Sequence, residues 1–378
     1  MKEINRDFWK KWENRDNFMY FPVVYSVLLN KNYFEEWEDV MWYYNYLISG
    51  YDFNRNMLSY TRFFDIVREK GFFLSDSGGF QVYSLGAFIN PRRLVRYQSR
   101  LTNMGFILDS PPYKPLGENN KALSTVFDFD NFDEHLNKTI MWTRKMVEDL
   151  DDSSFSLGGI VHGVSYDTMS KWYDSISDLY DFKFWALGVK PPNDLFRLVK
   201  FLKFAEKKNI NSIHLLAVSG VKGILFLLYY QRYLNEKIYI TFDSSTPIKY
   251  SSLRTMIFWG GDNLVMRREG LSGVKLDRLN VEYIYDINKD LVEKSSRLKE
   301  FFKVNWNRKF RRETDLNIFL YFCNIFSLLD MIDYLRRCDD DEFKFLFRKS
   351  IKNHLKLLSL YERENFGFSS EIKKRGLF

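Results

Sequence analysis

Short apolar runs recur along the first two thirds of the chain, separated by charged stretches that are compatible with helices. Most runs are rich in aromatic or β-branched residues, and each ends in a small or polar residue. The strands expected from this pattern are 21–29, 71–76, 105–110, 155–163, 184–189, 212–220, 237–245 and 263–269. The helices expected between them are 91–104, 131–150, 166–180, 193–208 and 221–236. Buried strands that alternate with helical connections are typical of a parallel α/β sheet.

About eight strands of this kind fit a (β/α)8 TIM barrel, for which an open doubly wound sheet is the alternative. A barrel of this class places its chemistry at the carboxyl ends of the strands. Four of the expected strands end in or near an ionisable side chain, namely Asp76, Asp109, His162 and Asp243. The barrel therefore predicts that these side chains gather at one end of the fold.

The pattern changes after about residue 290 to long helices. Residues 315–337 are apolar on nearly every turn, and residues 343–364 are amphipathic. We therefore divide the chain into a barrel domain, 1–290, and a C-terminal helical subdomain, 291–378. The apolar stretch 316–329 is shorter than a membrane span and contains two asparagines, so we expect a buried helix and no membrane partner.

Composition excludes a disordered or fibrous chain, because 46% of the 378 residues are hydrophobic and 18% are aromatic. Lys and Arg total 56 against 49 Asp and Glu, and a net charge of +7 weakly favours a polyanionic partner. The only cysteines, Cys323 and Cys338, are too few for a disulfide framework or a four-thiolate metal site. The N-terminus is charged from its second residue, so we expect no signal peptide and a cytoplasmic protein.

One segment, SDSGGFQVYSLG at 75–86, places an Asp at a strand end before a flexible Ser-Gly-Gly turn. It resembles the signature of the tRNA-guanine transglycosylase superfamily, whose barrel enzymes exchange a guanine in nucleic acid for a 7-deazaguanine. Five further segments resemble the family's motifs in the same order: GFILDSPP, GGIVHG, WALGVKPP, HLLAVSG and FDSSTP. The six segments extend over roughly 200 residues, from the 75–86 motif to the FDSSTP motif, and make the resemblance specific.

The resemblance implies that Asp243 is the nucleophile, that Asp76 is the general acid and base, and that Asp109 reads the guanine edge. The other residues that it implies in base binding are Ser77, Gly78, Gln81, His162, Gly163, Gly188 and Val189. The chemistry agrees with these roles, because exchange at an anomeric carbon passes through an oxocarbenium-like state that a carboxylate can trap covalently. The target nucleotide must leave the base stack to reach such a site.

Two departures from the family pattern alter what the resemblance implies. His162 stands where the family usually has Gln, and an imidazole lacks the paired donor and acceptor of an amide, so a purely structural His is the alternative. The zinc ligands are also missing: residues 270–310 contain no Cys, and Leu316 falls where the zinc His would be. We therefore expect no zinc and no other cofactor.

Basic residues near the motifs are candidates for contact with the nucleic-acid backbone. Arg92, Arg93 and Arg96 follow the first motif at near-helical spacing, and Arg254 follows FDSSTP. A solvated surface is the alternative interpretation.

The expected activity is that of a glycosyltransferase (a pentosyltransferase) that inserts a preQ0-type 7-deazaguanine into nucleic acid. The missing zinc site and the absence of an appended RNA-binding domain favour DNA over tRNA. They make the chain look like the DpdA-type DNA transglycosylases of phages and bacterial modification islands, in which case it acts in the host cytoplasm. A zinc-free tRNA-guanine transglycosylase and a non-catalytic nucleic-acid-binding partner subunit are the alternatives, and the presence of both Asp76 and Asp243 argues against the subunit. Action as a homodimer, or together with a helper protein, is compatible with each.

Overall fold

The computed structural model describes most of the chain between residues 18 and 352. The described residues are 18–24, 28, 37–38, 41, 43–50, 61–115, 125–150, 155–188, 195–218, 220–260, 264–267, 271, 274–352, 356 and 359.

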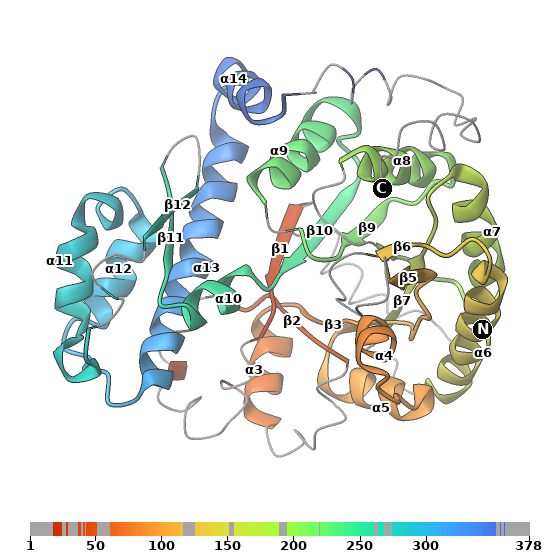
Figure 1. Ribbon diagram of the computed structural model, residues 1–378, viewed down its shortest axis with the longest axis horizontal. Coiled ribbons are helices and arrows are strands. Elements are labelled where there is room, and N and C mark those ends of the chain that lie inside the picture. Colours follow the sequence, from red (N-terminus) through yellow and green to blue (C-terminus); the bar gives the residue numbers. More distant parts are fainter. Residues whose placement is uncertain are drawn as a thin grey trace.

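Eight parallel strands form a nearly closed barrel at the centre of the molecule (Figure 1). They are β1 (Phe18–Pro22), β2 (Tyr46–Ile48), β3 (Phe73–Ser75), β4 (Met104–Phe106), β7 (Ser156–Val161), β8 (Trp185–Leu187), β9 (Ser212–Leu215) and β10 (Tyr239–Ser244). Their spatial order is β1-β10-β9-β8-β7-β4-β3-β2. The end strands approach each other at a parallel bridge between Val23 and Leu47, where the Val24 amide donates to the Leu47 carbonyl at 2.8 Å. An open doubly wound sheet has no such contact between its edges, so the barrel prediction is confirmed at this level.

Helices surround the barrel, as Figure 1 shows. They are α3 (Thr61–Lys70), α4 (Gly79–Leu85), α5 (Pro91–Leu101), α6 (Phe132–Asp149), α7 (Tyr166–Ser177), α8 (Leu195–Lys207), α9 (Val221–Tyr229) with the π-helix η5 (Tyr230–Leu234), and α10 (Thr246–Ser252). Helix α7 shows why these segments fold locally: Ser165 forms a capping box with Thr168, and Met169, Trp172 and Ile176 form one buried face. A small antiparallel hairpin, β5 (Tyr113–Pro115) and β6 (Thr125–Phe127), interrupts the connection between β4 and α6.

Aromatic side chains fill the interior of the barrel. The His214 ring on β9 lies 5.1 Å from the Phe106 ring on β4 and 6.2 Å from the Phe21 ring on β1, centroid to centroid. Strands β4 and β9 are not neighbours in the sheet, so the contact between Phe106 and His214 crosses the interior. The barrel is therefore a packed core, and a side chain on the same face as His214 points inward.

Two of the expected strands differ from the structure. The segment 263–269 does not join the barrel: β12 (Leu264–Arg267) pairs antiparallel with β11 (Met256–Trp259) in a separate hairpin. The eighth barrel strand is β2, only three residues long, in a stretch where the pattern predicted nothing. The first strand also begins earlier than expected, because β1 covers Phe18–Pro22. Runs of three residues carry too little periodicity to be recognised without their pairing partners.

Helices occupy the chain after β12. They are the 3-10 turn η6 (Leu276–Arg278), α11 (Val281–Val292), α12 (Ser296–Val304), α13 (Glu313–Arg337) and α14 (Asp340–Ser350). Residue 290, where we expected the barrel domain to end, lies inside α11. Most of the segment 353–364, expected to continue the last helix, lies outside the described residues.

Helix α13 packs along the barrel side of this region, against α10 and β11 (Figure 1). The Asn324 side chain accepts from the Ile257 amide at 2.8 Å and donates to the Thr255 carbonyl at 3.1 Å, while the Tyr321 hydroxyl donates to the Val23 carbonyl. Among the described residues, α13 is the one helix long and apolar enough to cross a membrane, and 83% of its apolar window is buried inside the protein. Its burial is what the core helix of a folded protein requires.

Candidate active site at the carboxyl ends of the barrel strands

The chemically versatile side chains predicted from the sequence lie where parallel barrel strands end. Asp76 follows β3, Asp109 comes three residues after β4, and His162 and Gly188 directly follow β7 and β8. Asp243 is the penultimate residue of β10. Because all these strands are parallel, the five residues lie at one end of the barrel, which is where barrels of this class carry their catalytic residues.

Asp243 is a buried carboxylate on the inner face of β10. Thr241, two residues earlier, pairs in register with His214 and contacts its ring, so Thr241 and Asp243 share the inward face. One carboxylate oxygen, Oδ1, accepts from the Ala217 amide at 2.9 Å and lies 3.3 Å from His214 Nε2. Within the described part of the chain, Oδ2 forms no hydrogen bond. The side chain is thus fixed through Oδ1, and Oδ2 has no partner among the described residues.

The backbone that reaches Asp243 is strained. Ala217 has φ +60°, in the left-handed region that residues with a Cβ seldom occupy. This conformation aims the Ala217 amide at the carboxylate. Strain of this type is retained where the surrounding fold over-determines it, often at functional sites.

Asp76 lies on the turn after β3, and two backbone amides orient it. Its Oδ1 accepts from Gly50 at 2.8 Å and from Gly78 at 2.9 Å. Gly78 has φ +73°, which glycine adopts without steric cost, and it begins the turn into α4. Asp76 is partly exposed, so its carboxylate is held in place yet remains accessible for proton transfer.

Asp109 and His162 form a second buried pair. His162 Nε2 lies 2.7 Å from Asp109 Oδ2, and the Ser77 hydroxyl donates to Asp109 Oδ1 at 2.5 Å. The residues are 2% and 4% exposed, for His162 and Asp109 respectively. Both carboxylate oxygens that we expected to read the guanine edge are therefore already engaged by protein. His162 Nδ1 is buried and has no hydrogen-bond partner within the described regions.

Two glycines allow this pair to form. A Cβ on Gly188 would lie 2.1 Å from His162 Cε1, and a Cβ on Gly79 would lie 2.3 Å from Asp109 Oδ1. Any larger residue at either position would displace the imidazole or the carboxylate. The requirement for small residues at 79 and 188 is thus a consequence of the Asp109–His162 contact.

An aromatic and cationic cluster, absent from the predicted site, surrounds His162. The Trp172 ring lies edge-on at 4.7 Å and the Tyr113 ring at 6.0 Å. The Tyr113 hydroxyl donates to the Gly188 carbonyl at 3.2 Å and accepts from the Arg197 guanidinium. Burial raises the pKa of Tyr113, and the Arg197 charge partly opposes that increase. No sequence signal marks Arg197, since it is one of four cations spaced along α8.

The remaining predicted base-binding residues differ in their contacts, and one of them lies outside the described part of the chain. Gly163 accepts from Arg197 at 2.9 Å through its carbonyl. Gln81 lies in the first turns of α4, and its Oε1 is buried without a hydrogen-bond partner in the described structure. Val189 lies outside the described residues.

The predicted backbone-binding arginines form protein contacts. Arg92 and Arg96 on α5 pair with Asp149 at the end of α6, and their hydrogen bonds to Asp149, that of Arg96 foremost, lower the pKa of this carboxyl. Arg93 lies over the Tyr97 ring. Arg254 pairs with Glu313 at the start of α13. These contacts give all four arginines a structural role, whatever else they bind.

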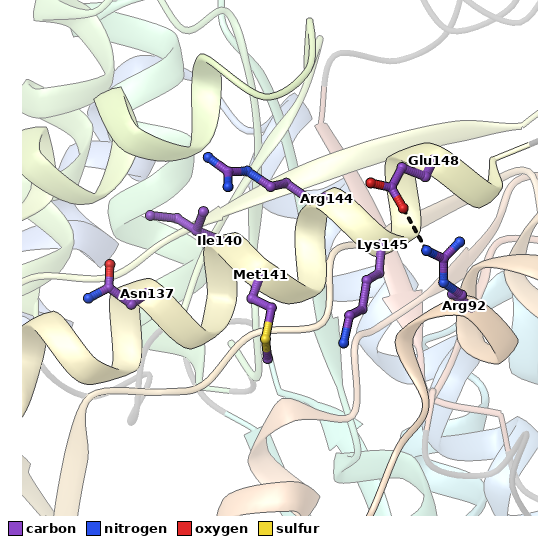
Figure 2. A pocket seen from close by; sticks show the side chains of 7 residues that line it. All are labelled: Arg92, Asn137, Ile140, Met141, Arg144, Lys145 and Glu148. Carbon is purple, nitrogen blue, oxygen red and sulfur yellow. Dashed lines mark hydrogen bonds and ion pairs between the residues drawn. The ribbon is translucent and has the colours of Figure 1, made fainter.

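Figure 2 shows an open pocket of about 560 Å³ between α5 and α6. Arg92 lines it from α5, where it pairs with Glu148 at 2.6 Å. The other residues that line it come from α6: Asn137, Ile140, Met141, Arg144, Lys145 and Glu148. The pocket lies in the helical layer outside the strands and contains none of the carboxylates of the candidate site.

Among the described residues, no group of three or more His, Cys, Asp or Glu side chains could hold a metal ion. Cys323 and Cys338 are both buried, and burial raises the pKa of each thiol.

No protein-family model and no curated protein sequence matches this chain. The fold and the site define a parallel barrel with two carboxylate–histidine pairs and a third, glycine-bound carboxylate at the end where such barrels carry catalytic residues.

Proposed function

We propose that the protein is a base-exchange transglycosylase that replaces guanine in nucleic acid, DNA in the first instance, by a 7-deazaguanine. The observation that carries this proposal is the state of Asp243. It is a buried carboxylate at the carboxyl end of the barrel, held through Oδ1, with Oδ2 forming no hydrogen bond to the described residues. A fixed carboxylate with one oxygen available is what a covalent glycosyl intermediate requires.

The reaction consists of two displacements at the sugar carbon C1′. Asp243 Oδ2 bonds to C1′ as the bond from C1′ to guanine N9 breaks, and Asp76 in its acid form gives a proton to the departing base. Asp76 then takes the N9 proton of the incoming 7-deazaguanine. That base attacks C1′, the ester bond to Asp243 breaks, and both carboxyl groups return to their starting forms.

Asp109 and His162 support recognition of a flat base. Each carboxylate oxygen has about two acceptor positions, so a base can still donate to Asp109 beside Ser77 and His162. Trp172 and Tyr113 enclose the imidazole in apolar surface, which strengthens such hydrogen bonds. A base in this position must have left the stack, so we expect a flipped or unpaired nucleotide as the substrate.

The net charge of +7 supports a polyanionic substrate but does not distinguish DNA from tRNA. DNA is preferred because residues 270–310 contain no Cys and Leu316 stands where the zinc His of the family would be. A tRNA substrate is the alternative within the same chemistry.

The test offers purified protein radiolabelled guanine with duplex DNA and unmodified tRNA in parallel reactions. A second arm starts from DNA and tRNA that carry labelled guanine, and follows its release on addition of preQ0. Asp243→Asn removes the nucleophile, and Asp65→Asn removes an exposed carboxylate from α3 as the matched control. We expect exchange into DNA with the wild type and with Asp65→Asn, and a loss of roughly 10⁶-fold with Asp243→Asn.

Exchange into tRNA alone would overturn the choice of polymer and leave the chemistry standing. Failure of both arms with both polymers, or an Asp243→Asn variant as active as the wild type, would overturn the proposed function.

A further inference from the structure

A chain of hydrogen bonds connects the nucleophile to the interior of the barrel through His214. The Thr241 hydroxyl oxygen lies 2.9 Å from His214 Nδ1 and 3.2 Å from the Ile213 carbonyl oxygen. The other ring nitrogen, Nε2, lies 3.3 Å from Asp243 Oδ1. His214 is 1% exposed, so its hydrogen bonds must come from these partners.

The contact with Asp243 fixes a proton on His214 Nε2, because a carboxylate oxygen can only accept. A bare Nε2 lone pair that faced this oxygen in a buried site would be unfavourable. With its hydrogen on Nε2, the ring accepts at Nδ1 from the Thr241 hydroxyl, for which Nδ1 is a closer acceptor than the Ile213 carbonyl.

Packing holds the ring in this orientation. Phe106 lies 5.1 Å from the imidazole on one side, and Phe21 meets it edge-on at 6.2 Å. The side chain of the nucleophile is thereby constrained twice, by His214 and by the strained Ala217 amide, and both contacts use Oδ1. What remains for reaction is Oδ2.

We propose that His214 is a positioning residue for Asp243, with its ring oriented by Thr241. Its Nε2–H donates to Oδ1, so that Oδ2 points at the sugar carbon. This inference rests on the proposed function only in taking Asp243 as the nucleophile. The hydrogen-bond arrangement itself can be measured without any activity.

The first test is nitrogen NMR of protein labelled at histidine, which is tractable because the chain has only four. His214→Gln assigns the His214 signals. We expect a proton on Nε2 in the wild type, a changed Nδ1 signal in Thr241→Val and a changed Nε2 signal in Asp243→Asn. A His214 protonated on Nδ1 alone, or an Nε2 signal that does not respond to Asp243→Asn, would overturn the arrangement.

The second test measures the rate of covalent adduct formation with nucleic acid in a single turnover, together with the dissociation constant for the same polymer. We expect His214→Leu to slow adduct formation roughly 10²-fold with unchanged affinity, as for other small misplacements of reacting groups. Thr241→Val should slow it less. His214→Gln should recover part of the rate, because its amide can still donate to Oδ1.

Thr143→Val is the matched control, because Thr143 is fully buried on α6 and its hydroxyl has no hydrogen-bond partner in the described structure. It should react at the wild-type rate. A His214→Leu variant that reacts at the wild-type rate, or that loses affinity alone, would overturn the positioning role. If the wild type forms no adduct with any polymer, the proposed function has failed, and the NMR result still decides whether Thr241 and His214 hold Asp243.

Discussion

The two Asp–His pairs of the barrel are built from the same side chains but leave different groups unused. In the pair after β4 and β7, Asp109 uses both oxygens, on Ser77 and His162, and the unpartnered atom within the described structure is an imidazole nitrogen. In the pair on β9 and β10, both nitrogens of His214 are engaged, and the atom that lacks a partner in the described part of the chain is Asp243 Oδ2. The difference shows that the surrounding hydrogen bonds, rather than residue type, decide which member of a pair is available to react.

The two pairs also differ in hydrogen bonding at the carboxylate and in the backbone strain beside it. In the Asp109 pair both carboxylate oxygens are hydrogen-bonded, which holds the two side chains rigid, as a surface that recognises a ligand requires. The Asp243 pair keeps a carboxylate oxygen that has no donor among the described residues, and a strained alanine lies beside it, a feature that is common at functional sites.

The largest expected contrast is in stability. Asp109→Ala should lower the free energy of unfolding by about 3–5 kcal/mol, because it leaves His162 and Ser77 without their buried partner. Asp243→Ala should cost less, since His214 keeps its bond to Thr241. Urea denaturation of the two variants measures both. Equal losses would show that the pairs do not differ as the geometry indicates.

A smaller loss of stability is expected when a substitution displaces the Asp109–His162 pair than when it removes Asp109. Gly188→Ala places a methyl group 2.1 Å from the His162 ring, and overpacking of this type costs about 1–3 kcal/mol. The thermal midpoint should fall, and the affinity for the incoming base should weaken more than the rate of adduct formation. A variant with wild-type stability would show that the ring has room to move, and that the pair is not rigid.

We expect the stability of the protein to depend on pH through a histidine that lies near Asp109. His135 bonds to Ser110, next to Asp109, and burial lowers the pKa of this histidine below 6.5. The unfolded chain therefore binds more protons in that range, so the stability contribution is complete above about pH 6.5 and declines as the pH falls below it. His135→Asn should flatten the acid side of the stability curve relative to the wild type. Parallel curves for the two proteins would contradict the assignment to His135.

The smallest expected change in stability comes from a substitution at Ala217, whose amide bonds to Asp243. Ala217→Gly should raise stability by about 0.5 kcal/mol, since relief of a left-handed alanine gains roughly 1–2 kcal/mol and the added freedom of glycine costs roughly 0.5–1. Adduct formation should change little, because the backbone amide is retained. Chemical denaturation with careful replicates can detect the change. A clear loss of stability would mean that the Ala217 methyl group contributes packing that outweighs the strain.

Local signals predicted much of this fold. The long helices α6, α7 and α13 were expected within a few residues of their observed ends, because α6 and α7 each have a buried face and α13 is an apolar run buried on nearly all sides. Six barrel strands, β3, β4 and β7–β10, were expected inside the observed sheet for a similar reason, since apolar runs ending in polar residues mark buried parallel strands. Strand β2 was missed, and β12 was misassigned to the barrel, because pairing partners rather than local pattern decide where a short strand belongs.

The candidate site was predicted in its parts but not in its connections. Asp76, Asp109, His162 and Asp243 follow from their positions at strand ends and from the motifs they belong to. His214 was given no catalytic role, and Tyr113 and Arg197 had no signal that tied them to the site.

By itself, the sequence determined the long helices, most of the buried strands and which acids stand at the strand ends, because burial patterns and turn residues act over a few positions. The tertiary structure alone decided that His214 meets Asp243, 29 residues away, and that Asp109 meets His162, 53 residues away. These contacts depend on the register of neighbouring strands and on the closure of the barrel, which place side chains from distant segments on one inward face. No local pattern encodes that register, so only the assembled barrel shows that Asp109 is bonded through both oxygens and Asp243, within the described residues, through one.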